Sequence, residues 1–280
     1  MFIEWLNSTE RSNVAALARH VEAADGPGNS PLSEQGYFNL HEQCRHLLHW
    51  QDGQLAGYLQ HDTRMGTAQL MVAPEFRRRG IATAMLAQLG RQVPVWAFGN
   101  LPPAQALAAK LDYRGIRELL VMERALGPGS DSEARLPDGF TVRGYREADL
   151  DALAAVNAAA FAHHPEQGRM TAADFRERMA ESWFDPAGLL LVFAGGRLAG
   201  FHWTKRETPD RGEVYVIGVA EWAQGQGLGR ALLDAGLDHL RQQGVQTVFL
   251  YVDASEEKPV RMYDRAGFEQ VHRDVLWEAT

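Results

Sequence analysis

Two glycine-containing turns carry the residues of this sequence best suited to bind an anion. In one, Gly225, Gly227 and Gly229 alternate at the start of a run with helical spacing, and a looser copy upstream has Gly80 and Ala82. A small residue lets phosphate oxygens approach the backbone, and the unpaired amides at a helix N-terminus carry partial positive charge. The spacing therefore predicts two sites for a phosphate group such as a pyrophosphate.

The two turns share one pattern: Gln or Arg, two residues, Gly, one residue, then Gly or Ala. A P-loop would need Lys and a hydroxyl residue after the turn, whereas Arg230 and Ala231 stand there. A dinucleotide fold would need the glycines directly after the first strand of a βαβ unit, but a meander of strands precedes this turn. A glycine turn alone often only punctuates a chain. Two copies in the same context favour binding.

The elements that must position these turns occur twice in the same order: hairpin, strand, turn and helix, strand, short helix, strand. In the second half we expect them over residues 189–205, 212–219, 228–243, 247–255, 259–267 and 268–279, after a strand at 140–145 and helices at 149–161 and 172–183. In the first half we expect them over residues 46–62, 67–72, 77–89, 94–98, 103–115 and 116–126. An internal duplication explains this order economically. The stretch 126–140 is rich in Gly, Pro, Ser and Asp and is typical of a linker.

Composition narrows the class of protein. The chain has 280 residues, 45% of them hydrophobic, which allows two cores, and its formal charge of −8 argues against nucleic acid as the main partner. The single cysteine, Cys44, precludes an intrachain disulfide and favours a reducing compartment. The sequence shows neither a signal peptide nor an apolar run long enough for a membrane span. We therefore expect a cytoplasmic protein.

The order strand, turn, helix, strand, followed by "RMYDRAGF", resembles the GNAT acetyltransferase superfamily. It is closer still to the mycothiol synthase family, tandem GNAT enzymes of actinobacteria, through "PLSEQ", "RRRGIAT", "NAAAFAHHPEQG", "ESWFDPAGLLL", "GFHWTK", "GEVYVIGV" and "QGQGLGRALL". The resemblance covers nearly the whole chain. It implies an α/β fold with mixed sheets in two tandem GNAT-like domains, residues 1–126 and 140–280, joined by a linker at 127–139. It also implies a monomer.

In that superfamily the glycine turn grips the pyrophosphate of acetyl-coenzyme A (acetyl-CoA), which serves as co-substrate. The resemblance implies acetyl-CoA contacts in both halves. In the first half they are Leu70, Met71, Val72, Arg78, Arg79, Gly80, Ile81, Ala82 and Thr83. In the second half they are Ile217, Gly218, Val219, Gln224, Gly225, Gln226, Gly227, Leu228, Gly229, Arg230, Glu256 and Arg261.

Acetyl transfer to an amine needs a base, a donor for the oxyanion and an acid for the departing thiolate. We expect Glu213 as the base, directly or through water, although a strand-end carboxylate is often only a solvated charge. Gly218 could mark a bulge that frees the Val219 amide for the oxyanion, or it could be a packing glycine. Tyr263 could protonate the thiolate, or it could be a core aromatic.

The first half repeats the binding turn without this pair. Aligning the strand ends puts Gly66 at the position of Glu213, and aligning Tyr113 with Phe268 puts Ala108 at the position of Tyr263. The first half is therefore expected to hold coenzyme A (CoA) without catalysing transfer.

The resemblance implies a small-molecule acceptor, the cysteinyl amine of cysteinyl-glucosaminyl-inositol. Its expected contacts are Glu34, Glu166, Lys205, Glu213 and Tyr251. Composition alone would explain Glu34 and Lys205 as surface charges.

One position departs from the family pattern. Glu256 stands where the family has an asparagine that contacts CoA, and a carboxylate there repels phosphate. This puts the cofactor contacts from Glu256 to Arg261 in doubt.

Other functions stay open from sequence. His163 and His164 are adjacent and lack a cysteine partner, so we expect no metal site. The alternatives to the expected reaction are a GNAT enzyme acting on another amine, such as a peptide N-terminus or an aminoglycoside, and a non-catalytic acyl-CoA sensor.

Overall fold

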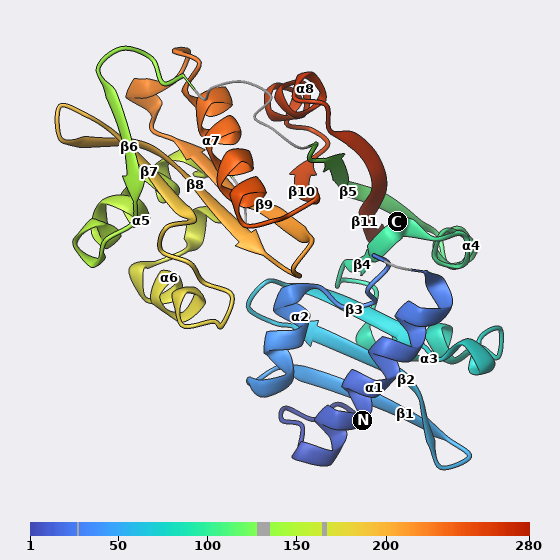
Figure 1. Ribbon diagram of the computed structural model, residues 1–280. Helices are drawn as coiled ribbons and strands as arrows, with labels where there is room; N and C mark the ends of the chain where they lie inside the picture. The colour runs from blue at the N-terminus through green and yellow to red at the C-terminus, as the bar shows by residue number, and fades with distance from the viewer. Residues whose placement is uncertain (27, 128–134, 164–166) are drawn as a thin grey trace. The chain divides into compact units, whose positions relative to one another are not determined.

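The computed structural model describes residues 1–26, 28–127, 135–163 and 167–280. Contacts between Cα atoms divide the chain into two compact units. Unit 1 comprises Met1–Leu120, Asp253–Ser255 and His272–Thr280, and unit 2 comprises Val121–Val252 and Glu256–Val271. Each is an α/β unit with a mixed sheet (Figure 1).

Unit 1 is built on strands that pair in the order β1-β2-β3-β4-β11-β5. Its hairpin and following strand are antiparallel, whereas β3 and β4 are parallel. Helix α1 packs on β2 and β3, and α3 follows the first glycine turn. The element bounds are α1 Ser8–Asp25, α2 Glu34–Phe38, β1 Arg45–Gln51, β2 Gln54–Asp62, β3 Thr67–Val72, α3 Ile81–Leu89, β4 Val95–Ala97, α4 Pro102–Lys110 and β5 Tyr113–Ala125.

Unit 2 repeats this arrangement with strands in the order β5-β10-β9-β8-β7-β6. Helix α7 lies across β8 and β9, which it contacts along its apolar stripe (Figure 1). Helices α5 and α6 pack together, and α5 contacts β8 and β9. The element bounds are β6 Phe140–Gly144, α5 Leu150–Ala160, α6 Ala172–Met179, β7 Leu189–Ala194, β8 Arg197–Arg206, β9 Arg211–Val219, α7 Leu228–Gln242, β10 Thr247–Asp253, α8 Glu257–Arg265 and β11 Glu269–Ala279.

The two compact units do not correspond to the residues before and after the linker at 127–139. The final segment, His272–Thr280, belongs to unit 1, whereas residues 121–126 belong to unit 2. In unit 1, Val275 of β11 pairs antiparallel with Ala97 of β4, so the last strand of the chain lies between β4 and β5. Ion pairs Arg273–Glu118 and Arg114–Glu278, of 3.0 and 3.2 Å, join β11 to β5. The end of β11, the last strand of the second half of the sequence, therefore belongs to unit 1, and the end of β5, the last strand of the first half, belongs to unit 2.

Asp274 is a buried carboxyl group on this segment of β11. Its side chain is 5% exposed, and its Oδ1 accepts a hydrogen bond from the Gly99 amide at 2.7 Å. Burial raises the pKa of Asp274 from 3.8 to about 6. Ionising it is therefore harder in the folded chain than in the unfolded one, and a stability penalty develops as the pH rises from about 4 to about 6 and persists above that.

We predict that Asp274→Asn stabilises the chain at pH 8 and that the gain shrinks toward pH 4. The raised pKa sets an upper bound of about 3 kcal/mol on the gain, and the Asn oxygen keeps the Gly99 hydrogen bond. Urea unfolding at pH 4, 6 and 8 measures it, with the exposed Asp151→Asn as control. A gain that stays constant across this range would contradict the prediction.

Candidate active site

The site of unit 2 begins where two parallel strands separate. Strands β9 and β10 pair only from Arg211 with Thr247 to Glu213 with Phe249. Beyond Glu213, residues 214–219 continue toward the glycine turn with β8 alone as hydrogen-bonded neighbour. Unit 1 opens in the same way, because β3 and β4 pair only through Ala68 and Gln69. Each half therefore has a gap in its sheet next to its turn.

Backbone amides of β9 point into this gap. The Ala220 amide donates to the Ala199 carbonyl at 2.8 Å, and Val219 lies opposite Gly200. Antiparallel strands alternate the direction of their amides, so the Val219 amide points away from β8. In unit 1 the Ala73 amide donates to Ala56 at 2.9 Å, which turns the Val72 amide the same way. Both gaps therefore present an amide to an oxygen atom.

The predicted bulge at Gly218 is wrong. Gly218 pairs in register with Phe201, and the register shifts instead where Trp203 faces Val216 and Thr204 faces Val214. Tyr215 is therefore the extra residue. Gly218 is a packing glycine, because a Cβ atom there would lie 2.5 Å from the Phe201 ring.

The bulge at Tyr215 decides which way Glu213 faces. Side chains alternate along a strand, so without an extra residue Glu213 would share a face with Ile217 and Val219. Those two pack toward α7, against Leu228 and Leu232. With the bulge, Glu213 lies opposite Lys205 of β8, on the face that carries Trp203 and the cluster beneath α5 and α6.

Glu213 and Lys205 form a sheltered charge pair on this face. Their side chains are 9% and 12% exposed, and Lys205 Nζ lies 3.7 Å from Glu213 Oε2. The same ammonium lies 5.1 Å from the ring centre of Trp183 and 5.6 Å from that of Tyr215. A buried carboxylate is costly unless it is paired, and here a cation held by two aromatic faces is its partner.

Trp183 and Tyr215 were not among the site residues predicted from sequence. Trp183 packs against Trp203 and edge-on against Tyr215, with ring centres 5.8 and 5.1 Å apart. The quoted stretch "ESWFDPAG" contains Trp183, but the position of a loop aromatic over a strand residue is set only by the folded chain.

Tyr263 lies on α8, the short helix after β10. It is buried, its ring meets Phe268 edge-on with centres 5.7 Å apart, and burial raises its pKa. The phenol therefore stays protonated across the working range of pH, which is the form that donates a proton.

The two glycine turns have the same backbone conformation. Gly225 and Gly227 have φ of 77° and 79°, and their counterparts Arg78 and Gly80 have 63° and 82°. A Cβ atom at Gly225, Gly227 or Gly80 would meet nothing within 4 Å, so the space above each turn is open. Neither α7 nor α3 has a side-chain cap, which leaves their first amides for a ligand.

The first residue of each pattern braces its turn. Gln224 Nε2 donates to the Val219 carbonyl at 3.3 Å, and Arg77 Nε donates to the Val72 carbonyl at 3.2 Å. Arg77 also pairs with both oxygens of Asp25, at 2.7 and 2.8 Å. These side chains tie the strand end to the turn.

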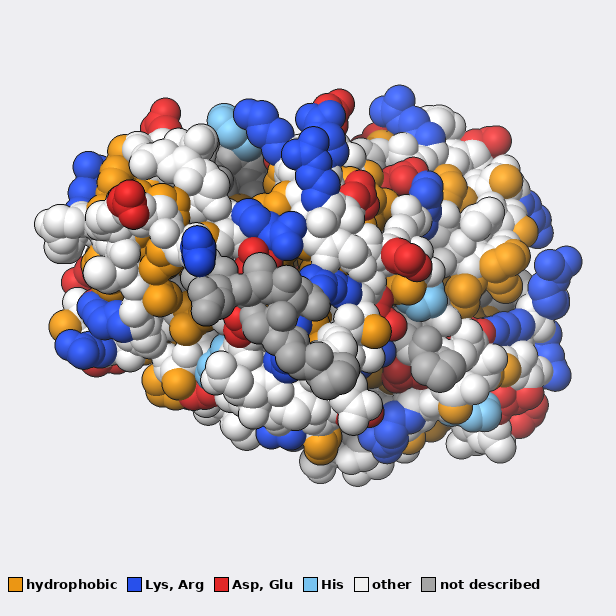
Figure 2. Space-filling view, turned by 45° about the horizontal axis from the view of Figure 1, so that its top comes forward, with side chains coloured by type: hydrophobic (Ala, Val, Ile, Leu, Met, Phe, Trp, Pro, Cys, Tyr) orange, Lys and Arg blue, Asp and Glu red, His pale blue; other side chains and the backbone are white. Residues whose placement is uncertain are grey.

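Charge at the second turn is largely engaged within the protein. Arg230 Nε lies 2.9 Å from Asp234 and its Nη1 donates to the Arg265 carbonyl, while Arg261 pairs with Glu257 at 3.1 Å. The Glu256 side chain caps no amide of α8. In unit 1, the Arg79 guanidinium lies over the Phe76 ring beside the turn. Figure 2 shows basic and acidic side chains interspersed on the face it draws.

Unit 1 differs from unit 2 at both catalytic positions. Strands β2 and β3 pair without a bulge, so the counterparts of Glu213 and Lys205 are Thr67 and Asp62. The predicted alignment with Gly66 is one residue off, because Tyr215 has no counterpart in β3. In unit 1 the last pair of β3 with β4 is at Gln69. The side-chain amide of Gln69 donates from Nε2 to Oε1 of Gln60 at 3.2 Å.

The match of Ala108 with Tyr263 agrees with the helix ends. The C-cap residue of α4 is Leu111, followed by Asp112 with φ 55°, and the C-cap residue of α8 is Ala266, followed by Gly267 with φ 79°. Ala108 and Tyr263 each lie three residues before the closing residue of the helix.

The remaining acceptor residues are spread over the chain. Glu34 begins α2, and its neighbour Ser33 caps that helix. Tyr251 on β10 is 52% exposed and meets Phe249 edge-on. Glu166 and His164 lie outside the described residues.

Among the residues that are described, no group of three or more His, Cys, Asp or Glu is arranged to hold a metal ion. In that same part of the chain, no helix is long and apolar enough to cross a membrane.

Comparison with known proteins agrees with this arrangement. Residues 156–268 match the Acetyltransferase (GNAT) family and residues 29–94 the Acetyltransferase (GNAT) domain. A mycothiol acetyltransferase of Propionibacterium freudenreichii is 48% identical over 96% of this chain and 89% of its own length. One of Rhodococcus opacus is 42% identical over 97% and 95%. A solved tandem GNAT protein from the clavulanic acid biosynthesis pathway, 20% identical, has a TM-score of 0.76 and covers 100% of this chain and 98% of that one, which shows the same fold.

We predict that Gly218→Ala destabilises the chain by about 1–3 kcal/mol, because the new methyl group overlaps the Phe201 ring. Phe201→Leu alone also destabilises, since Phe201 is fully buried, but it leaves room for the methyl group. The double variant should therefore lose less than the sum of the two losses in urea unfolding. Strict additivity would show that Gly218 is not a packing glycine.

Proposed function

This chain belongs to the mycothiol acetyltransferase family of GNAT acetyltransferases, and we propose how its second half performs the transfer. The reaction moves the acetyl group of acetyl-CoA to the cysteinyl amine of cysteinyl-glucosaminyl-inositol. One observation carries the assignment to the second half: Glu213 is buried at the last paired residue of β9 and β10, beside Lys205. The first half has Thr67 at that position.

Acetyl-CoA binds with its pyrophosphate on the second turn and its thioester in the gap of the sheet. The open space above Gly225 and Gly227 and the uncapped amides of α7 suit the phosphates. The Val219 amide points into the gap and donates to the thioester oxygen. Negative charge that develops on this oxygen in the transition state strengthens that hydrogen bond.

Glu213 accepts a proton from the substrate ammonium, directly or through water, and the nitrogen of the resulting neutral amine attacks the thioester carbon. The Lys205 ammonium lies 3.7 Å from Glu213 Oε2 and is the cation that pairs with this buried carboxylate. The C–S bond then breaks, Tyr263 donates its phenolic proton to the thiolate, and the nitrogen loses its second proton, which gives the neutral amide and restores the phenol. Burial keeps this phenol protonated until that step.

The acceptor lies against the face that carries Glu213. Lys205 supplies a donor to sugar or inositol hydroxyl oxygens, and the exposed ring of Tyr251 supplies a contact surface. Glu34 and Glu166 complete the proposed contacts. The enzyme is proposed to work in the cytoplasm.

The first half is proposed to hold CoA without catalysing transfer. Its turn repeats the conformation of the second, and its amide at Val72 points into its own gap. Thr67 stands there in place of the proposed base, the neighbouring carboxylate of Asp62 accepts a hydrogen bond from the side chain of Asn39 at 2.9 Å, and Ala108 offers no acid.

We predict that CoA thiol is released from acetyl-CoA with cysteinyl-glucosaminyl-inositol and not with glucosaminyl-inositol, which lacks the cysteine. Tyr263→Phe and Glu213→Gln should each lower kcat by roughly 10²–10⁴, because each removes one proton transfer. Ala108→Ser in the first half is the control and should leave kcat unchanged. Release with neither acceptor, despite acetyl-CoA binding, would overturn the assigned substrate and leave another amine or a sensor.

We also predict that changes in the two turns affect acetyl-CoA binding alike but affect the rate of thiol release differently. Gly80→Val and Gly227→Val each force a β-branched residue into a left-handed conformation that such residues avoid. Each should remove one equivalent of bound acetyl-CoA in calorimetric titration, but only Gly227→Val should abolish thiol release. If Gly80→Val abolished release while thermal unfolding stayed unchanged, catalysis would not belong to the second half alone.

A further inference from the structure

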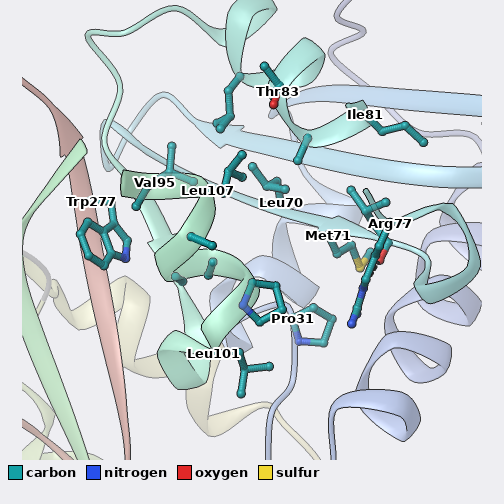
Figure 3. A pocket seen from close by; sticks show the side chains of 18 of the residues that line it. Pro31, Leu70, Met71, Arg77, Ile81, Thr83, Val95, Leu101, Leu107 and Trp277 are labelled. Carbon is teal, nitrogen blue, oxygen red and sulfur yellow. Dashed lines mark hydrogen bonds between the residues drawn. The ribbon is translucent and has the colours of Figure 1, made fainter. Parts of the chain in front are cut away.

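Unit 1 contains a cavity of about 490 Å³ that runs from its glycine turn into the gap between β3 and β4. At one end Arg77 and Ile81 belong to the turn region, and Trp277 lies on the opposite side (Figure 3). Between them Leu70, Val95 and Leu107 line the space. The cavity thus joins a phosphate-binding turn to an apolar chamber.

The apolar chamber of unit 1 lies at the position that corresponds to the ring of Tyr263 in unit 2. Ala108 occupies that position at the end of α4 and lines the cavity. In unit 2 the Tyr263 ring is buried against Phe268, whereas Tyr113, the counterpart of Phe268, lines the cavity of unit 1. Exchanging a phenol for a methyl group leaves the volume of a ring next to the place where the sulfur of a bound thioester would lie.

The walls of this chamber are apolar and aromatic. Leu107, Leu111, Trp96 and Trp277 line it together with Ala108. Such a surface stabilises alkyl groups, whereas the charged residues of the lining are Asp25 at the end of α1, Arg77 and Arg78 of the turn, and Lys110 at the end of α4. The Gln69–Gln60 network lies at the start of the gap, where Thr67 replaces the carboxylate that is the proposed base in unit 2.

We propose that the first-half cavity binds a CoA thioester whose acyl chain is longer than acetyl, and holds it without reaction. This inference rests on the proposed role of the first turn as a CoA site. The acyl chain occupies the space that Ala108 leaves open, while the second half, with Tyr263 in place, accepts acetyl. The two halves therefore select different acyl groups.

The expected selectivity follows from the apolar area. Each buried methylene tightens binding about fourfold. Butyryl-CoA has two more methylenes than acetyl-CoA, so the first half should bind it about fifteenfold more tightly.

The test is calorimetric titration of the full chain carrying Gly227→Val, which leaves the first site, with acetyl-CoA and butyryl-CoA. We expect tighter binding of butyryl-CoA by about tenfold or more. Adding Ala108→Tyr should reverse the preference while acetyl-CoA still binds. The reciprocal chain, Gly80→Val, leaves the second site and should prefer acetyl-CoA, and Tyr263→Ala in that chain should admit butyryl-CoA.

The outcomes separate this inference from the proposed function. Equal affinity for both thioesters in the Gly227→Val chain would overturn the acyl selectivity and leave the CoA site standing. Binding of neither thioester in that chain, with normal thermal unfolding, would overturn the CoA site of the first half as well. The chain-length comparison needs no change at Ala108, so a misfolded Ala108→Tyr variant cannot conceal a negative result.

Discussion

The position of the proposed base depends on a single extra residue in one strand. Tyr215 is the extra residue of β9 where the register with β8 shifts, and by bulging it turns Glu213 away from α7 and onto the face of Lys205. A carboxylate buried in an apolar wall would be unstable alone, and the bulge places it beside a cation. The same residue then contributes its ring to the aromatic faces that hold this cation. Position, charge partner and surroundings of the proposed base thus share one cause.

The two halves share the backbone of the turn and differ at the positions of the proposed base and acid. The turns are nearly identical in backbone conformation although one has arginine where the other has glycine, because Arg78 adopts the same left-handed conformation as Gly225. The strands that lead to the turns both end with an amide directed into the gap. What differs is local: a bulge present or absent, and a phenol or a methyl group on the last helix. Small changes at fixed backbone positions therefore distinguish the proposed reactive site from the proposed binding site.

Much of this arrangement could be predicted from sequence because its signals are local. The glycine turns, the helical stripe of α7 and the duplicated order of elements all follow from spacing within short windows, and the structure confirms them. The position of the bulge could not be found in this way. Gly218 carries the usual signal for a bulge but is required by the Phe201 ring, whereas Tyr215 carries none. Its cause is the pairing of β9 with β8, which is a property of two strands.

Two further features escaped prediction for similar reasons. One is the placement of His272–Thr280 in unit 1, where it pairs with β4. β5 and β11 are equivalent strands at the ends of the two halves, so the sequence of neither strand indicates which half it will pair with. The aromatic support of Lys205 comes from a residue on a loop, Trp183, and from the bulged Tyr215. Resemblance identified Lys205 itself, but only the folded chain shows what holds it in place.

The most direct test of the central claim is to remove the bulge. Deletion of Tyr215 is compared with Tyr215→Ala, which keeps the extra residue and loses only the ring, by the rate of acetyl transfer in a single turnover. Acetyl-CoA binding in the second half serves as the check that its fold persists. We predict a loss of at least roughly a hundredfold in the deletion, the size expected when a general base is turned away, and a much smaller loss in Tyr215→Ala. Equal rates in the two variants would show that the bulge does not orient the base, and would contradict the account.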